Sequence, residues 1–88
     1  MDDMLRTPVD GTRRRILTRL GEPDTAERGL TADDIAAGLG IPLPVALTHL
    51  RFLTSLGLLR TVRRGDRLHY RRDEIRIAEV TRLFEKGW

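Results

Sequence analysis

Apolar residues recur at helical spacing in several segments of the 88-residue chain. The first such segment carries Ile16, Leu17 and Leu20 along one side, while its arginines lie largely outside that stripe. A one-sided pattern of this kind is typical of an amphipathic helix with one buried face. It predicts a helix over residues 12–20, which ends before Gly21.

A second helix is predicted over residues 31–39. Leu30 and Thr31 start it, because Thr31 is a good N-cap and Asp34 stands at the position from which a side chain reaches back to the cap. The buried stripe would consist of Ile35, Ala36 and Leu39. Gly40 follows at the point where the apolar pattern stops and is expected to end the helix.

The third helix is expected to follow a proline-containing turn at residues 41–44 and to begin near Leu43 or Pro44, because proline suits the first turn of a helix. It would run to Leu56, with Gly57 after it in a left-handed turn. Its core face would carry Ala46, Leu50 and Leu53, whereas Thr48, Arg51 and Ser55 point elsewhere. One face therefore serves a core, and the other is available to a partner.

The remaining chain predicts two short strands and a last helix. The strands cover residues 59–63 and 68–72, and Gly65 between them is a hairpin signal. A final helix over residues 73–86 would be capped by Asp73, and residues 1–10 would form a flexible N-terminal arm. The predicted fold is thus mainly α with a small β-hairpin, arranged over residues 11–88 as a winged helix-turn-helix.

Charge is distributed unevenly along the chain. The whole sequence has a formal charge of +3 and a pI near 10.5. Residues 60–72 contain six arginines against one aspartate, whereas residues 22–34 contain five acidic residues against one arginine. The molecule should therefore have one positive and one negative end, and the positive end suits an acidic partner such as nucleic acid.

Other classes of protein fit the sequence poorly. The chain has no cysteine for disulfides or a zinc-thiolate site, and no apolar run approaches the roughly 20 residues that span a bilayer. Its acidic start, where a signal peptide would be basic, makes a cytoplasmic location the simplest expectation. We expect no metal site at His49 or His69, no cofactor and no enzyme activity, since no nucleophile, phosphate-binding glycine loop or acid pair has the necessary spacing.

Several segments resemble the winged helix-turn-helix repressors of the ArsR type. The resemblance covers roughly residues 13–73, and its carriers are RILTRL at 15–20, TADDIA at 31–36, HLRFL at 49–53, GLL at 57–59 and RGDRLHY at 64–70. It implies a dimeric transcriptional regulator that places its third helix in the major groove of double-stranded DNA and its wing on adjacent phosphates. By position, the groove-facing residues would be Leu43, Val45, Leu47, Thr48 and Arg51.

The start of the third helix departs from the family pattern. Members of the family usually carry Ser, Gln, Thr or Arg there, whereas this chain has Leu43, Val45 and Leu47. Apolar groups contact thymine methyls but cannot make the bidentate hydrogen bonds that discriminate base pairs. These residues could face DNA, dock a protein partner, or, in the case of Val45 and Leu47, turn inward against the wing or the second helix.

The wing and the last helix each allow two interpretations. Arg63, Arg64 and Arg67 could neutralise phosphates, although charged edge strands also serve to prevent edge-to-edge pairing. The apolar stripe of the last helix could cover its own subunit or pair with a second one. Aromatic residues at the end of a short chain favour a homodimer interface. Its predicted residues are Ile77, Val80, Phe84 and Trp88.

Overall fold

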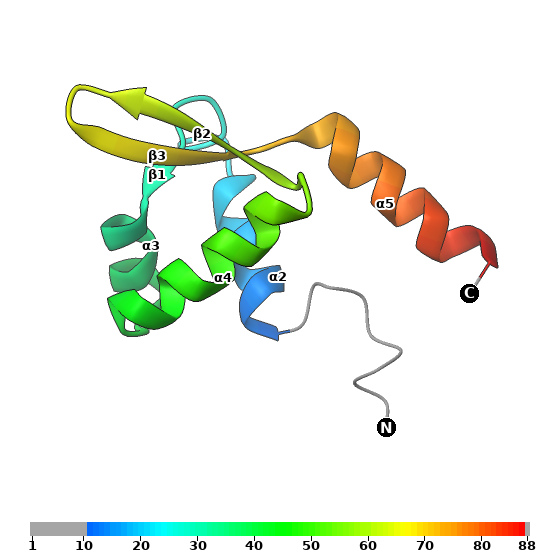
Figure 1. The fold of residues 1–88 in the computed structure, drawn as a ribbon, viewed down its shortest axis with the longest axis horizontal. Coiled ribbons are helices and arrows are strands. Elements are labelled where there is room, and N and C mark those ends of the chain that lie inside the picture. The colour runs from blue at the N-terminus through cyan, green and yellow to red at the C-terminus, as the bar shows by residue number, and fades with distance from the viewer. Residues whose placement is uncertain (1–10, 88) are drawn as a thin grey trace.

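The computed structural model describes the backbone of residues 11–87 and the side chains of residues 11–83 (Figure 1). The predicted N-terminal arm, residues 1–10, lies outside the described residues, as does Trp88. The elements in chain order are α2 (Gly11–Leu20), β1 (Leu30–Thr31), α3 (Ala32–Leu39), α4 (Leu43–Ser55), β2 (Leu59–Arg64), β3 (Arg67–Arg72) and α5 (Glu74–Gly87). This order confirms the predicted winged helix-turn-helix class.

Local capping signals set the ends of α3 as predicted. The Thr31 hydroxyl accepts a hydrogen bond from the Asp34 amide at 3.1 Å, and the Asp34 carboxylate accepts one from the Thr31 amide at 3.4 Å. Gly40 ends the helix in a left-handed conformation with φ 68°. Reciprocal capping satisfies two amides that would otherwise lack partners, so the helix begins at Ala32.

The prediction that Leu30 and Thr31 only start a helix was incomplete. They form a two-residue strand, β1, which pairs antiparallel with β3 in a sheet of order β1-β3-β2. Leu30 lies opposite Tyr70, and Thr31 lies opposite His69. A strand this short has no periodicity of its own, and its partner lies about 40 residues further along the chain.

The wing hairpin closes through the two-residue loop Gly65-Asp66, as its sequence predicts. Gly65 has φ 65°, whereas no residue other than glycine has a positive φ in the described chain. A single positive φ at the first loop position matches a type II′ turn, which suits the twist of the flanking strands. The strands extend by one residue each at the tip relative to the prediction, to Arg64 and from Arg67.

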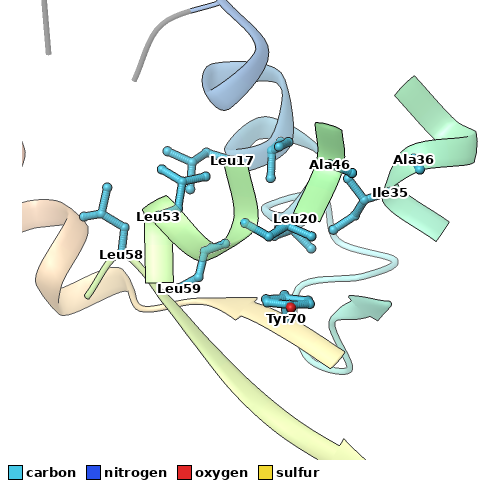
Figure 2. Close-up of a cluster of buried hydrophobic side chains, with 11 residues drawn as sticks. Leu17, Leu20, Ile35, Ala36, Ala46, Leu53, Leu58, Leu59 and Tyr70 are labelled. Atoms are coloured by element: carbon cyan, nitrogen blue, oxygen red, sulfur yellow. The ribbon is translucent and has the colours of Figure 1, made fainter. Parts of the chain in front are cut away.

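The core lies where the helices α2, α3 and α4 meet the base of the wing (Figure 2). Its most completely buried large side chains are Ile16, Leu20, Ile35, Leu50, Leu53 and Leu58. Tyr70 closes the cluster from β3. Each such side chain contributes about 1.5 to 3 kcal/mol by leaving water, so this cluster fixes α4 against the sheet.

Helix α5 leaves the body of the domain after β3 and extends away from the other helices (Figure 1). Asp73 caps it, as predicted, by accepting a hydrogen bond from the Arg76 amide at 3.0 Å. Ile77 and Val80 pack, partly buried, against the edge of the core. Among its described side chains, the helix therefore packs on the domain through its first half.

Candidate nucleic-acid interface

The solvent-facing side of α4 carries few hydrogen-bond donors. Thr48, Arg51 and Ser55 are exposed along it, as predicted. The Thr48 hydroxyl donates to the Pro44 carbonyl at 3.0 Å, and the Ser55 hydroxyl donates to the Phe52 carbonyl at 2.7 Å. The helix backbone thus uses both hydroxyl protons, and Arg51 is the charged donor that this face offers to a partner.

The apolar residues at the start of α4 do not all point the same way. Leu43 and Val45 are 38% and 40% exposed, so Val45 does not turn inward. Leu47 is half-buried and lines a shallow groove of about 520 Å³ together with Leu68 and Tyr70 of the wing. The inward orientation considered for Val45 and Leu47 therefore holds in part for Leu47 and is wrong for Val45.

Strand register divides the wing arginines between two faces. Arg63 lies opposite Leu68, on the same side as the buried Leu59 and Tyr70, and this side faces α4. The other side carries Arg60, Arg64, Arg67 and Arg71, in the cross-strand pairs Arg60 with Arg71 and Arg64 with Arg67. Like charges directly opposite one another destabilise a hairpin, so a bound anion would relieve this repulsion.

Several wing arginines have partners within the protein. The Arg64 Nε donates to the Arg28 carbonyl at 3.3 Å, and the Arg67 guanidinium forms an ion pair with Asp33 at 3.4 Å. Arg72 donates to the Leu17 carbonyl at 2.9 Å and therefore holds the base of the wing to α2. Arg63 is exposed and makes no ion pair with the described residues. Of the three predicted phosphate contacts, Arg63 is thus the least engaged internally.

The arginines of α2 are used mostly within the fold. Arg13 donates from Nε to His49 Nδ1 at 3.3 Å, and its guanidinium lies 4.1 Å from the centre of the Phe52 ring. His49 thus accepts a hydrogen bond from Arg13 within the fold. Arg19 contacts Asp24 and Glu22, and the hydrogen bond that it donates to Asp24 is the largest cause that raises its pKa. The ion pairs of Arg19 with Glu22 and Asp24 were not evident in the sequence pattern.

The exposed apolar surface of α5 differs from the predicted one. Leu83 is 61% exposed and Ile75 is 76% exposed, whereas Ile77 and Val80 are partly buried. Sequence reasoning omitted Leu83, although it borders the predicted stripe at helical spacing. The side chain of Phe84 and the whole of Trp88 lie outside the described residues.

The described residues contain no group of three or more His, Cys, Asp or Glu side chains that could hold a metal ion. Within the same part of the chain, no single helix is long and apolar enough to cross a membrane. The helices α3 and α4 are long and apolar enough only when they are taken together, and the chain bends by 117° between them.

Comparison with known proteins agrees with this architecture. A family model described as a helix-turn-helix domain matches residues 9–62, whereas no curated protein matches the sequence. A solved structure described as a possible transcriptional regulator for arsenical resistance is 30% identical, with a TM-score of 0.72 over 88% of this chain and 75% of that one. An ArsR-like regulator from Rhodococcus sp. RHA1 is 28% identical, with a TM-score of 0.71 over 88% and 68% of the two chains.

A third structure is a homodimeric winged helix-turn-helix DNA-binding domain from Mycobacterium bovis, described as a possible ArsR-family regulator. It is 34% identical, with a TM-score of 0.64 over 86% of this chain and 63% of that one. The fold and the α4–wing surface thus define a winged helix-turn-helix DNA-binding domain. Within that class, the chain belongs to the ArsR-type transcriptional regulators.

Proposed function

We propose that the protein binds double-stranded DNA as a homodimer, with α4 in the major groove and the wing on adjacent phosphates. The observation that supports this best is the common surface of Arg51 and the wing. Arg51 lines a groove of about 260 Å³ with Thr61 and Tyr70, which lie on the same side of the hairpin as Arg63. Arg51 would contact a base edge while Arg63 neutralises a phosphate.

The remaining predicted contacts supplement this pair. Leu43, Val45, Leu47 and Thr48 would lie against the base edges, and Arg64 and Arg67 would reach phosphates after leaving their present partners. Two domains related by a twofold axis would place two copies of α4 in successive major grooves, about one helical turn apart. The Mycobacterium bovis domain is a homodimer, and the exposed Leu83 gives α5 of this chain an apolar surface for such pairing.

The test is fluorescence-anisotropy binding to mixed duplex fragments at low and physiological salt. Arg51→Ala and Arg63→Ala should each weaken binding, and Arg63→Ala should also reduce the log-log salt slope by about 0.9 for each phosphate that the variant no longer neutralises. Arg82→Ala removes the same charge from the exposed part of α5 and should leave both quantities nearly unchanged. Equal effects of Arg63→Ala and Arg82→Ala would remove Arg63 from the interface.

A second candidate function is protein docking through Leu43, Val45 and Leu47. The exposure of the first two side chains is the observation that favours it. Absence of binding to any duplex at low salt would contradict the DNA proposal and favour this alternative.

A further inference from the structure

The beginning of α4 combines exposed apolar side chains with few side-chain hydrogen-bond donors. Leu43 and Val45 occupy its first turn, where Pro44 has no amide proton to offer. Thr48, one turn later, donates its hydroxyl proton to the Pro44 carbonyl. The first two turns therefore present mainly carbon atoms to whatever occupies this surface.

The side of α4 that carries Leu43 and Leu47, four positions apart, continues onto the wing, whereas Val45 lies on the other flank of the exposed helix face. Leu68 is 39% exposed and shares the shallow groove with Leu47. Its cross-strand partner is Arg63, so a guanidinium flanks the apolar groups on the same side of the hairpin. An apolar surface bordered by arginine suits a ligand that combines negative charge with small apolar groups.

The major groove of DNA is such a ligand. Phosphates line both of its edges, and the thymine C5-methyl is the apolar group that its base edges display. We propose that this protein selects its DNA site through thymine methyl groups, which pack on Leu43 and Val45, and through a guanine that receives Arg51. This inference rests on the proposed DNA-binding function and specifies the kind of sequence it recognises.

The geometry of α4 also gives the spacing between the two contacts. Leu43 and Arg51 are eight positions apart, which corresponds to about 12 Å along a helix axis. Successive base pairs of DNA are about 3.4 Å apart along the helix axis. With α4 along the groove, the thymine that packs on Leu43 should lie about three to four base pairs from the guanine in each half-site, and the one that packs on Val45 about two to three.

The experiment begins with selection of bound sequences from a random duplex pool, using the wild-type protein. Each thymine of the selected site is then replaced by uracil, which removes only the C5-methyl group and keeps the base pair. We expect each contacted methyl to contribute about fourfold to affinity, the effect of burying one such group. Replacement by uracil of thymines that do not lie opposite α4 should leave the affinity unchanged.

Protein variants identify the side chains involved. Leu43→Ala and Val45→Ala change exposed residues and should leave thermal unfolding close to that of the wild type. The double variant should bind the thymine and uracil duplexes with equal affinity, because it lacks the side chains on which the methyl groups would pack. Ile75→Ala, which shortens an exposed aliphatic side chain on α5, should retain the full discrimination.

The two proposals fail in different ways. A selected duplex that binds tightly but is insensitive to every uracil substitution would overturn the inference and leave DNA binding intact. Discrimination that persists in the combined Leu43 and Val45 variant would also overturn it. Failure to bind any duplex at low salt would overturn the proposed function itself.

Discussion

Arg67 at the tip of the wing forms an ion pair with Asp33 in the first turn of α3, with 3.4 Å between the guanidinium and the carboxylate. The two residues are 34 positions apart in the chain, so the contact joins the wing to the helix-turn-helix. Both side chains are largely exposed, and such a pair contributes only about 0.2 to 1 kcal/mol to stability. In the proposed DNA complex the ion pair has a further consequence, because Asp33 holds the Arg67 guanidinium that would otherwise contact a phosphate.

Replacement of Asp33 by Asn should therefore strengthen DNA binding. We expect severalfold higher affinity at low salt and a log-log salt slope steeper by about 0.9 per protomer, because Arg67 becomes able to neutralise a phosphate. The same change should lower the free energy of unfolding slightly, by about 0.3 to 1 kcal/mol, since Asp33 is an acid at a helix N-terminus. Anisotropy titrations over a salt series measure the first effect, and urea denaturation measures the second.

Glu79→Gln provides the control for this substitution. It changes the net charge of the protein equally but lies on α5, where Glu79 pairs with Arg76. A similar gain in affinity from both variants would show that only net charge matters and that the Asp33 pair does not restrain Arg67.

Gly29 should tolerate substitution less well than Gly40. Both have left-handed φ values, 77° and 68°, which cost a residue with a Cβ about 1 to 2 kcal/mol. A Cβ on Gly29 would also lie 2.4 Å from the Tyr70 carbonyl oxygen, whereas one on Gly40 meets nothing within 4 Å. Gly29→Ala must therefore push β1 away from β3, in addition to the conformational cost.

Urea denaturation of the two variants separates these effects. Gly40→Ala should lose about 1 to 2 kcal/mol, and Gly29→Ala should lose clearly more, together with protection of the β1 amides from hydrogen exchange. Equal losses would mean that the close approach of β1 to β3 relaxes without energetic consequence.

The elements predicted correctly from the sequence have local signals. The capping box of Thr31 and Asp34, the apolar stripe of α4 and the hairpin loop at Gly65 each depend on residues a few positions apart. Long-range contacts lacked such a signal. Strand β1 exists because Tyr70 lies beside it, and Arg72 reaches Leu17 across 55 positions.

In the candidate site, too, the sequence indicates local features but not long-range contacts. Alternation along the hairpin places Arg63 and Arg64 on opposite faces, which the sequence pattern already implies. It does not indicate that Arg67 pairs with Asp33, and it leaves open whether Leu47 turns toward the wing, because both depend on how the wing packs beside the helices.

Thr31 should contribute to stability through its side-chain cap. Thr31→Ala removes the acceptor for the Asp34 amide and should lower the free energy of unfolding by about 0.5 to 2 kcal/mol. In a domain of this size, each kcal/mol lowers Tm by about 4 to 8 °C. Thr31→Ser keeps the hydroxyl and should recover most of the loss; a serine variant as unstable as the alanine one would assign the effect to packing of the buried methyl instead.

The proposed dimer interface on α5 can be tested at Leu83. In the isolated chain this side chain is 61% exposed and borders the stripe that contains Val80. Leu83→Glu should convert the dimer to a monomer, because an unpaired carboxylate would be buried between two helices. Light scattering coupled to size exclusion measures the mass, with Ala78→Glu as the control. Ala78 is also exposed, but it stands two residues before Val80 and five before Leu83, so it lies on the other side of the helix. A Leu83→Glu protein that remains dimeric would place the interface elsewhere.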